Sequence, residues 1–109
     1  MPDATVERRD GQRCPMVLSA EVVELPRGAR LSARTSDISL TGCYIDTLNP
    51  VPQGSEVRLR LMHGGEVFEA TGQVIYVSFG LGMGVVFTKV DEEQRVRLER
   101  WLANKDKEF

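Results

Sequence analysis

Apolar and polar residues alternate through most of the chain between positions 16 and 90. The clearest case is the segment 55–62, in which Val57, Leu59 and Leu61 alternate with polar residues, two of them arginines. Because successive side chains of a β-strand point to opposite faces, this pattern predicts a half-buried strand. Glycine and proline, which favour turns, separate the segments that show it. The pattern predicts six strands, at residues 16–25, 29–38, 42–46, 55–62, 66–78 and 83–90.

The spacing of the apolar residues changes after residue 90. Leu98, Trp101 and Leu102 fall on one stripe with charged residues elsewhere, which predicts an amphipathic helix of about three to four turns. Asp91, followed three positions later by Gln94, resembles a capping box at the start of that helix.

The predicted fold class is all-β with one C-terminal helix. Six short antiparallel strands are expected to close into a barrel, because closure removes the exposed edges of the sheet. Gly72, within a long strand, is expected to mark a bulge or a bend. Residues 1–14 show no hydrophobic period and are predicted to form a flexible arm. Residues 15–104 would then form the barrel and helix, and residues 105–109 a tail.

The composition is that of an ordinary globular domain. The 109 residues are 41% hydrophobic and 28% charged, with a formal net charge of −2. No apolar run is long enough for a membrane helix, and the N-terminus lacks the apolar centre of a signal peptide. A cytoplasmic location without membrane insertion is therefore expected. The acidic balance argues against binding a nucleic-acid polymer, which usually needs a strongly basic surface.

Residues that carry catalytic or metal chemistry are sparse. Cys14, Cys43 and the single His63 are too few for a zinc site, so neither a metal nor a cofactor is expected. Both cysteines are predicted to be free thiols, although they would approach each other if the polar motifs beside them meet. His63 is expected to be an exposed turn residue. The glycines of 80–84 precede a strand rather than a helix, so we assign them to turns and close packing instead of a dinucleotide site. The chain is predicted not to be an enzyme.

Two polar motifs remain. Their residues are Arg8, Arg9 and Arg13 on the arm, and Asp37, Ser39 and Gly42 at the break between two strands. Taken alone, the first is a solvated basic arm. The second, taken alone, is a turn in which Asp and Ser cap backbone amides and Gly supplies a positive φ.

Together the two motifs suggest a ligand that contains both phosphate and guanine. Arginine forks bind phosphate and the O6 and N7 acceptors of guanine. A carboxylate suits the N1–H and N2–H2 donors of guanine. A glycine beside it would let the ligand approach the backbone closely.

In order and spacing these motifs resemble those of PilZ domains, which bind cyclic di-GMP in bacteria. The family pattern is RxxxR followed by [DN]xSxxG. The likeness extends over roughly residues 7–104, including TGCYI (41–45), VPQGSEVRLRL (51–61), GQVIYV (72–77) and GLGMGVVF (80–87).

The resemblance implies a six-stranded antiparallel barrel with a C-terminal helix and assigns a role to each motif residue. Arg9 and Arg13 would grip phosphates and guanine. Asp37 would accept the guanine donors, and Ser39 would hydrogen-bond the ligand. Gly42 would give the ligand clearance.

Two further residues extend the implied site. Arg8, just before the motif, favours a second, stacked nucleotide. Tyr76 occupies a position where family members can carry an aromatic that stacks on guanine, and it serves equally well as a plain barrel-face residue. Since no second domain is apparent, the signal would pass in trans to an unidentified downstream protein.

Two alternatives stay open from the sequence. The first is a PilZ-like adaptor that binds protein but no nucleotide, although such members usually lack the arginines. The second is a small barrel that binds single-stranded nucleic acid, against which stand the acidic balance and an aromatic content of only 6%.

Overall fold

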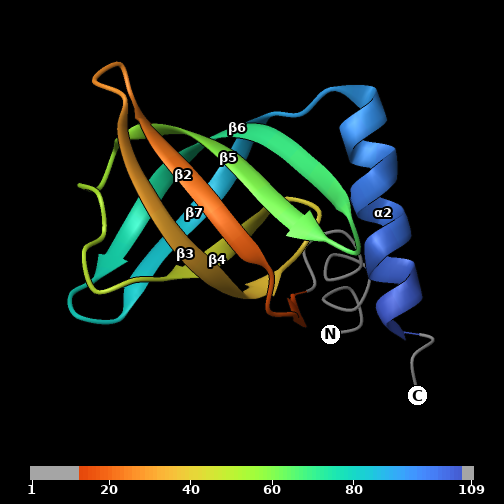
Figure 1. Cartoon of the computed structure of the whole chain (residues 1–109). Helices are drawn as coiled ribbons and strands as arrows, with labels where there is room; N and C mark the ends of the chain where they lie inside the picture. The colour runs from red at the N-terminus through yellow and green to blue at the C-terminus, as the bar shows by residue number, and fades with distance from the viewer. Residues whose placement is uncertain (1–12, 107–109) are drawn as a thin grey trace, which may run out of the picture.

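The computed structural model describes residues 13–106 (Figure 1). The expected strands and helix are all present, and a two-residue strand precedes them. The elements are β1 (Cys14–Pro15), β2 (Ser19–Leu25), β3 (Ala29–Ile38), β4 (Gly42–Asp46), β5 (Glu56–His63), β6 (Glu66–Ser78), β7 (Gly82–Lys89) and α2 (Glu92–Asp106).

The six long strands close into a barrel, as predicted. The sheet order is β1-β3-β2-β5-β6-β7-β4, and an additional β3–β4 pairing joins the ends. Each of these pairs is antiparallel. Figure 1 shows α2 beside the β5–β6 turn, with the β2–β3 and β6–β7 turns at the opposite side of the barrel. The register between β6 and β7 shifts between Thr71 and Gly72, which confirms the irregularity expected at that glycine.

The barrel interior holds the alternating apolar residues. One buried threonine also ties the segment before β2 to strand β3. Val57, Leu59 and Leu61 are fully buried, as their spacing predicts. Thr35 is also fully buried. Its hydroxyl donates to the carbonyl of Met16 at 2.7 Å and accepts from the N–H of Leu18 at 2.9 Å. Because these bonds tie residues 16–18 to β3, the segment just before them is held near the end of that strand.

Helix α2 covers the part of β6 that extends beyond β7. Trp101 and Leu98 are buried against the barrel. The Gln94 side-chain oxygen accepts from the N–H of Glu69 at 2.8 Å, and Arg97 donates to the carbonyl of Val67 at 2.6 Å. Gln94 therefore caps the open backbone of β6 and not the start of the helix, so its half of the capping box expected from the sequence is wrong. An edge satisfied in this way is closed to pairing with another chain.

The Glu66 carboxylate locks the far end of α2 to β6. Arg100 donates to it twice, at 2.9 Å each, and the Trp101 indole N–H donates at 2.9 Å. Together these bonds lower the pKa of Glu66 from 4.5 to about 2, and the bonds from Arg100 have a larger effect than the bond from Trp101. A depressed carboxyl pKa stabilises the fold above the unfolded pKa, and this contribution is lost as the pH falls.

Glu66→Gln is therefore expected to remove a pH-dependent part of the stability between about pH 4.5 and pH 2. Urea unfolding of wild type and variant at pH 6, 4 and 2.5 measures it, with Glu99→Gln on the exposed helix face as control. The stability difference between wild type and Glu66→Gln should shrink as the pH falls. If the two proteins lose stability in parallel, the bonds to Glu66 do not matter in solution.

The two cysteines lie on strands that are not neighbours. Cys14 pairs with Ile38, and Ile38 pairs with Cys43, so one strand separates the thiols. Two strand spacings put their Cα atoms about 10 Å apart, beyond the reach of a disulfide. Within residues 13–106, no group of three or more His, Cys, Asp or Glu is placed to hold a metal ion. In the same part of the chain no helix is both long and apolar enough to cross a membrane.

Candidate functional site

The structure brings one residue of each sequence motif into contact. Arg13 and Asp37 are 24 positions apart, yet the Nη1 of Arg13 donates to the Oδ1 of Asp37 at 2.7 Å. Their side chains are 42% and 30% exposed, so the pair lies at the surface. Strand β1 explains this meeting, because Pro15 pairs directly with Asp37 and places Arg13 just beyond it. Arg8 and Arg9 lie outside the described residues.

A β-bulge turns Asp37 outward. The register of β3 against β4 shifts between Thr35 and Asp37, so Ser36 is an extra residue in the strand. Thr35 and Ile38 are both fully buried. With strict alternation Asp37 would share the inner face with Thr35, and Ile38 would face solvent. The bulge reverses this assignment, as bulges beside binding sites often do.

Ser39 holds the β3–β4 turn together. It is only 2% exposed. Its hydroxyl oxygen accepts from the N–H groups of Thr41 at 3.1 Å and Gly42 at 3.3 Å. Its own N–H donates to the carbonyl of Gly42 at 2.8 Å. The turn described for this motif from the sequence is present, whereas a direct bond from Ser39 to a ligand stays a prediction.

Gly42 is required by the neighbouring strand. The positive φ considered for it in the sequence is not found, since the positive-φ glycines among residues 13–106 are at positions 28, 54, 64, 65 and 80. A Cβ on Gly42 would instead overlap the carbonyl oxygen of Val85 and come within 3.1 Å of the Cα of Val86. The glycine thus lets β4 approach β7 closely, and its role in ligand clearance stays a prediction.

A second bulge presents Tyr76 on the same outer surface. The register of β6 shifts between Val74 and Tyr76, so Ile75 and Tyr76 are both exposed, at 46% and 39%. Beside Tyr76 lies Tyr44, with ring centroids 6.1 Å apart and an interplanar angle of 34°. Tyr44 pairs directly with Asp37. No role was predicted for Tyr44 from the sequence, although alternation with buried Cys43 and Ile45 places it on the outer face.

Electrostatics link these groups. Partial burial alone would lower the pKa of Arg13, but its bond to Asp37 and its interactions with Asp37 and Tyr76 raise that pKa overall. Burial, followed by the nearby charge of Asp37, raises the pKa of the Cys43 thiol to about 12. Cys43 therefore stays protonated and unreactive at neutral pH. The site offers a permanent cation, a carboxylate and two aromatic rings on one surface.

A family model described as PilZ domain matches residues 7–104, which is most of the chain. The chain belongs to the PilZ domain family. Among curated protein sequences, none is similar enough to count as a relative.

Solved structures agree with the PilZ assignment at the level of fold. The PilZ domain of CeSA from a cellulose-synthesizing bacterium has a TM-score of 0.71 and 20% sequence identity, with 87% of this chain and 98% of that chain covered. The Bacillus subtilis inhibitor of motility (MotI/DgrA) has a TM-score of 0.71 and 14% identity. That match covers 86% of this chain and 48% of MotI/DgrA.

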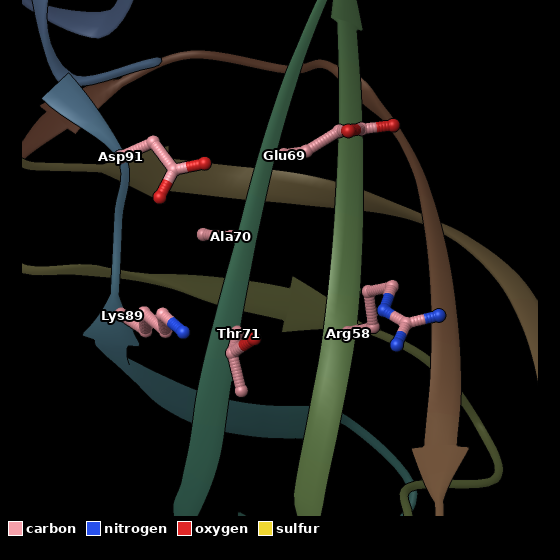
Figure 2. A pocket seen from close by; sticks show the side chains of 6 residues that line it. All are labelled: Arg58, Glu69, Ala70, Thr71, Lys89 and Asp91. Atoms are coloured by element: carbon pink, nitrogen blue, oxygen red, sulfur yellow. The ribbon is translucent and has the colours of Figure 1, made fainter. Parts of the chain in front are cut away.

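Two hollows on the PilZ barrel lie away from the Arg13–Asp37 pair. Figure 2 shows the first, of about 260 Å³, where Asp91 lies beside Ala70 and Lys89 points toward Thr71, while Arg58 lies on β5. It mixes both signs of charge and contains no aromatic ring. The second, of about 360 Å³, is largely apolar. It is lined by Pro50, Val51, Pro52, Gln53, Val77 and Phe79. Neither contains a residue of the predicted site.

Proposed function

We propose that this PilZ domain is a receptor for cyclic di-GMP, a second messenger. The supporting observation is the 2.7 Å bond between Arg13 and Asp37, which joins the RxxxR and DxSxxG motifs at one surface. Arg13 has further N–H donors and Asp37 a second oxygen, so a ligand can bind both without separating them. Phosphate would be held by Arg13 and guanine donors by Asp37. We assign no catalytic role to the domain.

The proposed mechanism is ordering of the part of the predicted flexible arm that precedes Arg13, since Arg13 and Cys14 already contact β3 in the free protein. Arg9 would join Arg13 on the ligand phosphates, with each charge-assisted bond contributing about 1.5–3 kcal/mol. Ordering about eight arm residues opposes binding by about 1–2 kcal/mol for each residue. Because the free energy gained from the bonds and the cost of ordering are comparable, the affinity should be moderate. It should fall with salt, because salt screens the charges that make these bonds. Arg8 adds a third guanidinium, which favours a ligand of two stacked cyclic di-GMP molecules.

The ordered arm would present a new surface to a downstream protein. Exposed apolar side chains near the β6–β7 turn are candidates for contact with a protein partner. They are Leu48, Phe79 and Leu81, which are 78%, 90% and 69% exposed. The N–H of Thr47 donates to the carbonyl of Leu81 at 3.1 Å, which brings Leu48 near this turn. These side chains also favour the alternative function, an adaptor that binds protein but no nucleotide. The adaptor alternative gives no use to the Arg13–Asp37 surface, so we rank it second.

Calorimetric titration of the full chain with cyclic di-GMP distinguishes the two functions. A receptor should bind with saturable heat, a stoichiometry of one or two, and an affinity that weakens between 50 and 300 mM salt. GTP at the same concentration is the control, because it carries guanine and phosphate without the paired cyclic geometry. If no binding occurs at low salt, the receptor proposal fails and the adaptor alternative gains support.

A further inference from the structure

Tyr44 stands between the two groups that the sequence predicts to bind guanine. Asp37 on β3 pairs with Tyr44 on β4, Tyr44 pairs with Gly84 on β7, and Gly84 pairs with Tyr76 on β6. These four positions form one row across four adjacent strands. Tyr76 is three strands from Asp37, about 14 Å along the sheet, whereas Tyr44 is its immediate neighbour.

Two glycines of β7 make room for the tyrosine rings. A Cβ on Gly84 would overlap the ring of Tyr76, and a Cβ on Gly82 would come within 2.8 Å of the Cε2 of Tyr44. Both rings therefore lie over a strip of bare backbone. This confirms the close-packing assignment made for the glycines of 80–84. The turn role that was also predicted for these glycines is filled by Gly80, whose φ is +78°.

The rings of Tyr44 and Tyr76 form one continuous aromatic surface. Their centroids are 6.1 Å apart and their planes are inclined by 34°, so the rings contact each other. This spacing is too small for a base to enter between them and stack on both. A base must instead lie on the outer side of this aromatic surface, with one face of the base stacked on a ring.

We propose that Tyr44 is the stacking platform for the guanine that donates to Asp37, and that Tyr76 supports a second base of the ligand. This assignment rests on the proposed function and deepens it. A base held by Asp37 lies above the neighbouring strand, where Tyr44 is. Tyr76 lies two strands beyond β4, at a place suited to the other base of a dinucleotide. Tyr44 thereby becomes a specificity-determining residue for flat bases at this surface.

Titration of Tyr44→Ala and Tyr44→Phe with cyclic di-GMP tests the assignment. Loss of one stacking ring is expected to weaken binding by about 5- to 150-fold in the alanine variant. The phenylalanine variant keeps the ring and should bind within about twofold of wild type. Phe79→Ala is the matched control, because it removes an exposed aromatic at the β6–β7 turn, outside the row. A stacked base should also shift the Tyr44 ring proton resonances upfield in NMR spectra.

The outcomes separate this assignment from the function on which it rests. If wild type binds and Tyr44→Ala binds equally well, the platform is wrong and the receptor function stands. If Tyr44→Phe loses as much affinity as Tyr44→Ala, the hydroxyl and not stacking is responsible, and the assignment is overturned. If wild type does not bind, both the function and the assignment fail.

Discussion

Arg13→Ala is expected to weaken cyclic di-GMP binding by at least about 100-fold. Arg13 is the described residue of the arginine motif, and it contacts Asp37 directly. Removing it would cost at least two charge-assisted hydrogen bonds to the ligand, each worth about 1.5–3 kcal/mol. Asp37→Ala should also weaken binding, because it removes the oxygens that would accept the N1–H and N2–H2 donors of guanine.

The fold should tolerate both changes. Surface ion pairs contribute at most about 1 kcal/mol, so the free energy of unfolding should change little. Arg58→Ala is the control, since it removes the same charge from β5, the strand across the barrel from β4. Calorimetry gives the affinities and urea unfolding gives the stabilities. Unchanged affinity in Arg13→Ala and Asp37→Ala would defeat the proposed site.

Gly42→Ala is expected to destabilise the barrel by about 3 kcal/mol, even without ligand. The added methyl group would meet the carbonyl oxygen of Val85 and the Cα of Val86, which are backbone atoms of a paired strand and cannot move aside separately. The β4–β7 contact would have to open. Since β4 carries Tyr44 and follows the Ser39 turn, ligand affinity should fall as well.

Urea unfolding of the free protein measures this effect. Gly64→Asn is a suitable control, because Gly64 has a φ of +58° that Asn tolerates and a Cβ there meets nothing within 4 Å. It should leave stability nearly unchanged. If Gly42→Ala binds ligand weakly while keeping wild-type stability, the glycine serves ligand clearance, and its assigned packing role is wrong.

The local spacing of apolar residues was sufficient to predict the strands of the barrel and its helix. Alternation located the six long strands, and the stripe of Leu98 and Trp101 located the helix, because both periods follow directly from burial. Strand β1 was missed because a two-residue pairing leaves no periodic signal. The first long strand was predicted to begin at residue 16, whereas it begins at Ser19.

The site was harder to predict, because it depends on breaks in the pattern. Bulges at Ser36 and Ile75 reverse the alternation and turn Asp37 and Tyr76 outward. The phase change is visible in the sequence, where Ile38 falls out of step with Thr35, but its meaning depends on which strands pair. Tyr44 acquires significance only once Asp37 is known to lie opposite it. The packing reason for Gly42 likewise needs the position of β7, which follows 40 residues later.

A crystal structure of the full chain with cyclic di-GMP tests the binding surface most directly. The expected density places one guanine against Asp37 and Tyr44, a second base over Tyr76, and phosphates at Arg13 with the preceding arginines. Density in the hollow beside Arg58 and Lys89, or at the apolar surface around Phe79, would contradict the proposed site. So would crystals grown at saturating ligand that show none bound.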